Sequence, residues 1–179
     1  LVQSLAGHQH LEHVVFSRRE YHASNQRTST PYREETLRAV CSVLGSNCQV
    51  RSVNFSDSPL SFGGGDPQDV SLKESVIAAL SANQTLERLE IANVTNQEGP
   101  EILSTFLIGC ASARRLKYLD ISDNRLDEDA MVALADMVGT QTTLEEVRAK
   151  KLDLVSIDLG ALIASLKENT TLKTLDLSH

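Results

Sequence analysis

A pattern of apolar residues recurs along this chain, and its unit is clearest at Leu116–Leu126. Leucine or isoleucine occupies positions 1, 4, 6 and 11 of this frame, and asparagine occupies position 9. The frame starts at residues 11, 50, 86, 116, 144 and 172, which are 39, 36, 30, 28 and 28 residues apart. Such a period is typical of stacked repeats, none of which can bury its apolar face alone.

Large aromatic rings are scarce. The 179 residues include four Phe, three Tyr and no Trp. A core built from Leu, Ile, Val and Ala fits many small, equivalent layers better than one large globular core. The composition therefore agrees with a repeat architecture.

The residues before each frame start predict amphipathic helices. An apolar residue recurs ten and six residues before each start, and this separation of four places both side chains on one helix face. The pairs are Leu1 and Leu5, Val40 and Leu44, Val76 and Leu80, Phe106 and Cys110, Leu134 and Val138, and Leu162 and Leu166.

The expected ends of these helices carry their own signals. Thr30-Pro31 and the capping box Ser71–Glu74 predict two helix starts. The carboxylates of Asp127–Asp129 predict a further first turn, where the helix dipole favours them. Asparagine recurs three residues before the next frame at Asn47, Asn83 and Asn169.

The unit at Leu116–Leu126 matches the leucine-rich-repeat signature LxxLxLxxNxL at every marked position. A period near 28 leaves room for a full helix, as in the ribonuclease-inhibitor-like class. We therefore expect an α/β fold, a leucine-rich-repeat solenoid of right-handed βα repeats with a concave parallel sheet and convex α-helices. Residues 1–179 are expected to form a single domain of about six repeats. Neither end has a polar cap, so we interpret the chain as an excerpt of a longer array.

Two long spacings predict insertions between strand and helix, at Tyr21–Thr30 and at Ser58–Asp69. The second contains the glycine run Gly63–Gly65, which invites comparison with a phosphate-binding loop. No GK[ST] sequence follows it, and we interpret the run as a loop. No cofactor is expected.

Positions 3, 5 and 7 of each frame are expected to face the open concave surface, because positions 4 and 6 point inward. The columns are His13, Ser52, Arg88, Tyr118, Glu146 and Thr174, then Val15, Asn54, Glu90, Asp120, Arg148 and Asp176, then Ser17, Ser56, Ala92, Ser122, Lys150 and Ser178. The most varied patch, and our candidate protein-binding site, is Arg88, Glu90, Tyr118, Asp120, Glu146, Arg148 and Lys150. Tyr and Arg are enriched at binding hot spots. The alternative is that Asp120, Arg148 and Asp176 merely neutralise one another across adjacent strands.

The charge and the cysteines limit the class of partner. The net charge is −7, with a balance of +2 over residues 1–51 and −9 over residues 52–179. An acidic body argues against nucleic acid, whose phosphates need clustered Lys and Arg. There is no run of 18 apolar residues, so we expect no direct membrane insertion. The three cysteines form neither a disulfide framework nor a metal cluster, and Cys41 and Cys110 fall on apolar helix positions. We therefore expect a cytoplasmic protein.

Glycosylation, metal and catalytic motifs are weak. The four N-x-S/T sequons begin at Asn54, Asn83, Asn93 and Asn169. We interpret them as coincidental, because Asn83 and Asn169 belong to the repeat and a glycan on Asn54 would cover the concave face. The histidines of the N-terminal stretch lack zinc spacing, and no serine or cysteine has the setting of a nucleophile. Neither a metal nor enzymatic activity is expected.

Ala79–Leu86, Leu119–Asn124 and Ser165–Leu172 resemble phrases in CARMIL-type actin regulators and, more distantly, in tropomodulins. The resemblance covers most of residues 36–179. It implies a non-catalytic protein–protein interaction scaffold of cytoskeletal type, with a protein partner on the concave face and a homodimer as an open alternative. Two further functions stay open from the repeats alone: a GTPase activator similar to the Ran activators, and a ligand-sensing domain of a NOD-like receptor.

Overall fold

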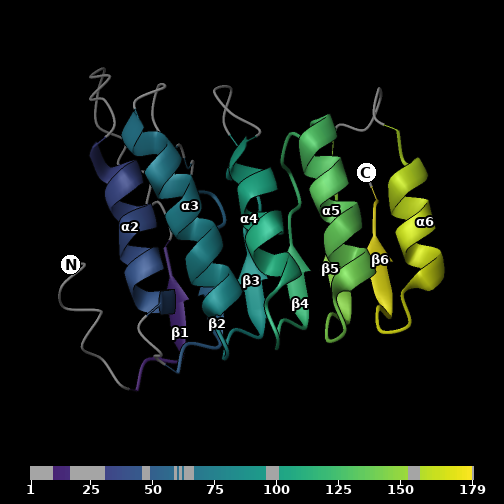
Figure 1. Cartoon of the computed structure of the whole chain (residues 1–179), viewed down its shortest axis with the longest axis horizontal. Coiled ribbons are helices and arrows are strands. Elements are labelled where there is room, and N and C mark those ends of the chain that lie inside the picture. The colour runs from purple at the N-terminus through teal and green to yellow at the C-terminus, as the bar shows by residue number, and fades with distance from the viewer. Residues whose placement is uncertain are drawn as a thin grey trace.

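The computed structural model describes residues 10–16, 31–45, 49–58, 60, 62, 67–95, 101–152 and 158–178. Strands and helices alternate along the chain (Figure 1). The strands are β1 (His13–Val15), β2 (Ser52–Asn54), β3 (Arg88–Glu90), β4 (Tyr118–Asp120), β5 (Glu146–Arg148) and β6 (Thr174–Asp176). The helices are α2 (Pro31–Gly45), α3 (Pro67–Ala82), α4 (Glu101–Ala111), α5 (Glu128–Thr140) and α6 (Gly160–Glu168).

The six strands form one parallel sheet in chain order. The register joins equal positions of the frame, so Arg88 lies beside Tyr118, which lies beside Glu146. The predicted columns at positions 3 and 5 are therefore confirmed along the whole sheet. Helices α2–α6 stand side by side over one face of this sheet (Figure 1). Neighbouring helices need about 8–10 Å and strands only about 4.8 Å, which places the sheet on the inner, concave side of the curve. The expected solenoid is confirmed.

The core lies between the sheet and the helices. Positions 4 and 6 supply its sheet side, for example Leu89 and Ile91, which are fully buried. The paired helix positions supply the other side, and Val76, Leu80, Phe106 and Cys110 are all buried. The spacing of four residues thus predicted the buried helix face correctly. Leu1 and Leu5 lie outside the described residues.

Strands β2–β5 are each followed by a turn with one left-handed residue. This residue is always at position 8: Asp57, Asn93, Asp123 and Lys151 have φ between 51° and 62°. In this conformation the backbone N–H of the residue donates to the carbonyl at position 7 of the next repeat, as the N–H of Asn93 does to the carbonyl of Ser122. Asparagine and aspartate tolerate the left-handed region better than most residues, which explains three of the four choices.

Amide side chains fasten the ends of helices α3, α5 and α6 to the neighbouring repeats. The Asn83 side chain donates to the Leu44 carbonyl of the preceding helix and accepts from the backbone N–H groups of Thr85 and Leu86. Asn169 makes the equivalent contacts to Val138, Thr171 and Leu172. Gln141 takes the same position before β5, and its Nε2 donates to three carbonyls of the preceding turn. Asn47 lies outside the described residues.

The predicted helix starts are correct in part. Asp127 caps α5 by accepting from the backbone N–H of Ala130 at 2.8 Å, with Glu128 and Asp129 in the first turn. Helix α2 begins at Pro31 as expected, while its predicted cap, Thr30, is outside the described residues. The capping box at Ser71–Glu74 is wrong, because α3 begins four residues earlier, at Pro67. Proline has a preset helical φ and no N–H to satisfy, so it suits the first helical position.

The predicted insertions also need correction. Tyr21–Thr30 and the glycine run Gly63–Gly65 lie outside the described residues. The segment expected as a loop at Ser58–Asp69 contributes two buried core residues, Leu60 and Phe62. Leu60 also forms a parallel bridge with Thr95. Its apolar side chains thus extend the core layer beyond β2, and helix α3 takes up the last part of the segment.

Candidate protein-binding face

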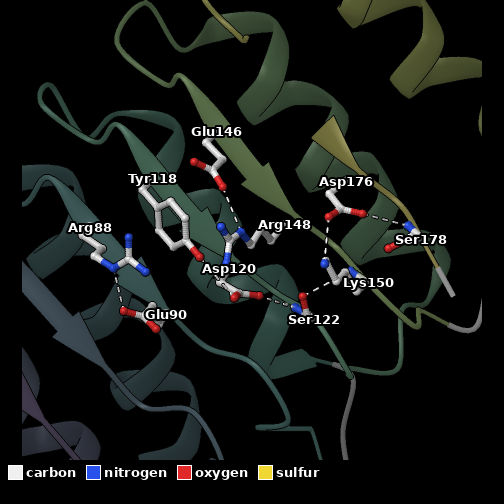
Figure 2. A network of polar contacts seen from close by, with 10 residues as sticks. All are labelled: Arg88, Glu90, Tyr118, Asp120, Ser122, Glu146, Arg148, Lys150, Asp176 and Ser178. Carbon is white, nitrogen blue, oxygen red and sulfur yellow. Dashed lines mark hydrogen bonds and ion pairs between the residues drawn. The ribbon is translucent and has the colours of Figure 1, made fainter. Parts of the chain in front are cut away.

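The candidate face is the surface of the sheet opposite the helices, and positions 3, 5 and 7 of β3–β5 form it. Figure 2 shows its side chains, which include all seven predicted site residues. The sheet register brings Arg88, Tyr118 and Glu146 into one row and Glu90, Asp120 and Arg148 into the next. The structure therefore places the predicted residues together on one face.

Tyr118 is at the centre of this face, and its surroundings differ from the expectation. We predicted an open aromatic side chain, but Tyr118 is only 8% exposed. The Arg88 guanidinium carbon lies 3.5 Å from its ring centroid, and that of Arg148 lies 5.4 Å away. A ring between two guanidinium groups gains cation–π attraction, and here it is also shielded from water. Burial, followed by the nearby Asp120 carboxylate, raises the pKa of Tyr118.

The arginines are fixed by carboxylates of their own strands. Arg88 Nε donates to Glu90 at 2.6 Å, and Arg148 Nε donates to Glu146 at 2.8 Å. Burial acts to lower the pKa of Arg88, but the hydrogen bond and charge of Glu90 outweigh it and the pKa is raised. The hydrogen bond from Arg148 to Glu146 raises the pKa of Arg148. Both guanidinium groups are thereby held beside the tyrosine ring.

The charged residues of this face form other ion pairs than those considered in the sequence analysis. Asp120, Arg148 and Asp176 do not form a chain of ion pairs; Arg148 pairs with Glu146, and Asp176 pairs with Lys150 at 3.0 Å. The Asp120 carboxylate accepts from the Tyr118 hydroxyl and from the Ser122 backbone N–H. Hydrogen bonds from Ser178 and Lys150 lower the pKa of Asp176 to about 2. The face is thus covered by polar contacts that extend beyond it to Asp176 of β6 (Figure 2).

A second polar row was missed by the sequence reasoning. Position 2 of the frame alternates in charge along the solenoid, as Glu12, Arg51, Glu87, Lys117, Glu145 and Lys173. Glu87 pairs with Lys117 at 3.0 Å and with Arg51 at 3.5 Å, and Glu145 pairs with Lys173 at 2.8 Å. Hydrogen bonds from these lysines lower the pKa of Glu87 and of Glu145. We call this row the position-2 ladder. The repeat frame that predicted the other columns also predicts this alternation of charge at position 2, once that position is read along the chain.

The asparagines of three sequons make hydrogen bonds within the repeats, and one of the thiols is buried. Asn83 is 4% exposed and Cys110 is fully buried. Asn54 donates to Glu90 at 3.1 Å, and Asn93 donates to Asp57 at 2.9 Å. Burial raises the pKa of the Cys110 thiol to about 12.

Among the described part of the chain, no group of three His, Cys, Asp or Glu residues is arranged to hold a metal ion. Within those ranges, no helix is both long and apolar enough to span a bilayer.

The fold and its face define a leucine-rich-repeat solenoid with an open polar sheet surface. A family model described as "Leucine Rich repeat" matches residues 114–135 and 168–179, which include the frames of β4 and β6. The fold is similar to the solved structure of "Leiomodin-1 Actin-Binding Site 2 (ABS2)", with a TM-score of 0.59 and 19% sequence identity over 84% of this chain and 81% of that chain. A comparison with curated protein sequences gives no significant match.

Proposed function

We propose that this chain is a protein-interaction scaffold, whose partner binds the open sheet face formed by positions 3, 5 and 7. The observation that carries the proposal is the pre-formed polar network at Tyr118, with Arg88 and Arg148 on the two neighbouring strands. The in-register sheet and the ion pairs to Glu90 and Glu146 fix these side chains in advance. Fixed groups lose little conformational freedom on binding, which favours affinity.

Such a face suits binding better than catalysis. Its charged groups are already paired with one another, as in Arg88–Glu90, Arg148–Glu146 and Lys150–Asp176. A partner that meets this face finds alternating positive and negative groups at fixed spacing, which selects for complementary charge. The proposed activity therefore needs neither a cofactor nor a bound metal. We place it in a single domain over residues 1–179 and in the cytoplasm.

Actin is the partner to test first. A solved structure with a similar fold is named as an actin-binding site of leiomodin-1, and the repeats resemble those of actin regulators. At 19% identity the likeness in structure concerns the fold, so actin enters as a proposal about this chain. An actin surface would have to complement both the guanidinium groups and the carboxylates of the network.

The test compares two charge-matched double variants for binding to monomeric and to filamentous actin. Arg148→Ala with Lys150→Ala removes two cations from the face. Arg114→Ala with Lys167→Ala removes two exposed cations from helix ends outside it. We expect the first variant to weaken binding by about tenfold or more, which corresponds to about 1.4 kcal/mol, and the second to bind like the wild type. Equal binding of actin by both variants would contradict the proposal that the partner binds the sheet face. Absence of actin binding by the wild type would exclude actin as the partner.

A further inference from the structure

The ion pairs of the sheet face leave one carboxylate without a cation. Across β3–β6, positions 3, 5 and 7 carry three cations, each paired with a carboxylate: Arg88–Glu90, Arg148–Glu146 and Lys150–Asp176. Asp120 is the fourth carboxylate of these positions, and it forms no ion pair with any residue of the described ranges. The hydrogen bond to Glu146 is the largest cause of the raised pKa of Arg148, and the charge of Asp120 is a minor one. The face therefore keeps one negative charge at β4.

The contacts of Asp120 leave its charge in place. Its carboxylate accepts from the Ser122 backbone N–H at 3.0 Å and from the Tyr118 hydroxyl at 3.3 Å. Both donors are neutral groups, and a carboxylate has about four acceptor positions, so some of them stay open. Asp120 is half-buried, so part of its surface meets solvent on the open side of the sheet.

Asp176, at the equivalent position of β6, shows what completes such a carboxylate. It accepts from the Ser178 backbone N–H at 3.1 Å, just as Asp120 does from the residue at the same position of its own repeat. In addition, the Lys150 ammonium group lies 3.0 Å from its other oxygen (Figure 2). Asp176 thus has a hydrogen bond from its own repeat and an ion pair from the preceding repeat.

Ala92 has the position beside Asp120 that Lys150 has beside Asp176. Both residues are at position 7 of the repeat that precedes the carboxylate. The backbone agrees with this equivalence, because in both repeats the N–H of the next residue donates to the carbonyl at position 7 of the following repeat. The alanine side chain ends at Cβ and carries no charge. The chain therefore supplies no cation to Asp120 from this position.

We propose that Asp120 is the docking point on the sheet face for a basic side chain, lysine or arginine, of the protein partner. The partner's cation lies beside Ala92, as the ammonium group of Lys150 lies beside Asp176, and it neutralises the remaining charge of the face. This inference rests on the proposed function, because it names the partner's chemistry at the same face. Such charge complementarity selects among partners, since a partner with a carboxylate at this point would be repelled.

The test is a titration with pentalysine amide, followed through backbone amide signals in NMR at low ionic strength, where charges are least screened. The N–H groups of Ser122 and Ser178 donate to Asp120 and Asp176 at 3.0 Å and 3.1 Å, so they report the two carboxylates separately. In the wild type we expect pentalysine to shift the Ser122 signal and to leave the Ser178 signal in place, because Lys150 already pairs with Asp176. Fully acetylated pentalysine, which has no charged side chains, should shift neither signal.

Two substitutions change which carboxylate lacks a cation. Ala92→Lys supplies an ammonium group to Asp120 from within the chain, and should weaken the pentalysine binding that Ser122 reports by about threefold, as expected for one exposed ion pair. Lys150→Ala removes the cation from the second carboxylate, and the amide that reports this carboxylate should then respond as well. Ala78→Lys adds the same charge at an exposed position of α3 and should respond like the wild type. Circular dichroism establishes that each variant is folded.

Three outcomes of the titration would overturn the inference. The first is a Ser122 signal that pentalysine does not shift in the wild type. The second is an equal response of Ser122 and Ser178 in the wild type, because the ion pair of the second carboxylate would then make no difference. The third is an equal response of Ser122 in Ala92→Lys and in Ala78→Lys.

Actin binding separates this inference from the proposed function. If Arg148→Ala with Lys150→Ala weakens actin binding and Ala92→Lys does not, the sheet face remains the binding surface and Asp120 is excluded as its docking point. If the double variant and Ala92→Lys both bind actin like the wild type, the proposed function fails together with the inference. Weaker binding by both supports the docking point on the proposed face.

Discussion

Among the described residues, Asn124 makes the most side-chain hydrogen bonds to a neighbouring repeat, and its replacement by alanine gives a clear stability prediction. Its Oδ1 accepts from the backbone N–H of Val94 at 2.8 Å, from that of Thr95 at 3.0 Å and from the Thr95 hydroxyl at 3.2 Å. Its Nδ2 donates to the carbonyls of Ile91 at 2.7 Å and Ile121 at 2.9 Å. The side chain is 3% exposed, so water does not replace it readily.

The magnitude follows from these five hydrogen bonds. A net contribution of about 1 kcal/mol each would give about 5 kcal/mol for Asn124→Ala. Thr95 is half-buried, and its two groups can turn to water, which reduces the expected loss to about 3 kcal/mol. Asn54→Ala is the control, because Asn54 is half-buried and its side chain makes only two of these contacts, to Glu90 and from the Ser56 N–H. We expect it to cost less than about 1 kcal/mol, since water can replace both.

Urea unfolding followed by circular dichroism measures both losses. Hydrogen exchange adds a local readout, because the Val94 amide is expected to exchange faster in Asn124→Ala. A loss below about 1 kcal/mol for Asn124→Ala, or a loss equal to that of Asn54→Ala, would refute the reasoning that this side chain ties the two turns together.

Three further predictions follow from single contacts. Gln141→Ala removes the side-chain donor to the carbonyls of Cys110, Ala111 and Ala113, and should lower the free energy of unfolding in urea by about 2 kcal/mol. Gln141→Asn introduces the residue type found at the equivalent positions Asn83 and Asn169 and should lower it less. Gly109→Ala places a Cβ 2.9 Å from Leu80 Cβ and should lower the free energy of unfolding by about 1–3 kcal/mol, while Gly139→Ala meets only the Ser165 side chain at 3.2 Å and should change it little. The pKa of Asp176, about 2, is depressed in the folded state, so its stabilising contacts are complete above its ordinary pKa and are lost as the pH falls through about 2. Lys150→Ala should raise this pKa in an NMR titration, and an unchanged value would contradict the role of Lys150.

The fold could be predicted from the sequence because its information is local and repeated. Val40, Val76 and Leu134 needed only the spacing of four residues to be placed on a buried face. The sheet register followed from the frame, since equal positions lie side by side in stacked repeats. Gln141 carried the same signal as Asn83 and Asn169, three residues before a frame start, and was missed because only asparagine was considered.

The features that could not be predicted depend on contacts between repeats or on the irregular segments. Tyr118 is buried by Arg88 and Arg148, which come from the neighbouring strands at a separation of 30 residues. The position of Tyr118 in the frame predicted the face on which its side chain lies, but not the residues that bury it. The start of α3 at Pro67 was hidden by a more conventional capping sequence four residues later. Leu60 and Phe62 are buried but fall in the long spacing between the frame starts at 50 and 86, where the repeat pattern does not predict which residues are buried.

Lysine acetylation with and without actin, read by mass spectrometry, tests the central claim most directly, because it compares two faces in one experiment. Lys150 lies on the sheet face with 45% of its side chain exposed, and Lys167 is exposed in the last turn of α6. The scaffold proposal predicts that bound actin slows acetylation of Lys150 and leaves Lys167 unchanged. Slower acetylation of Lys167 with Lys150 unchanged would place the partner on the helices and contradict the proposal.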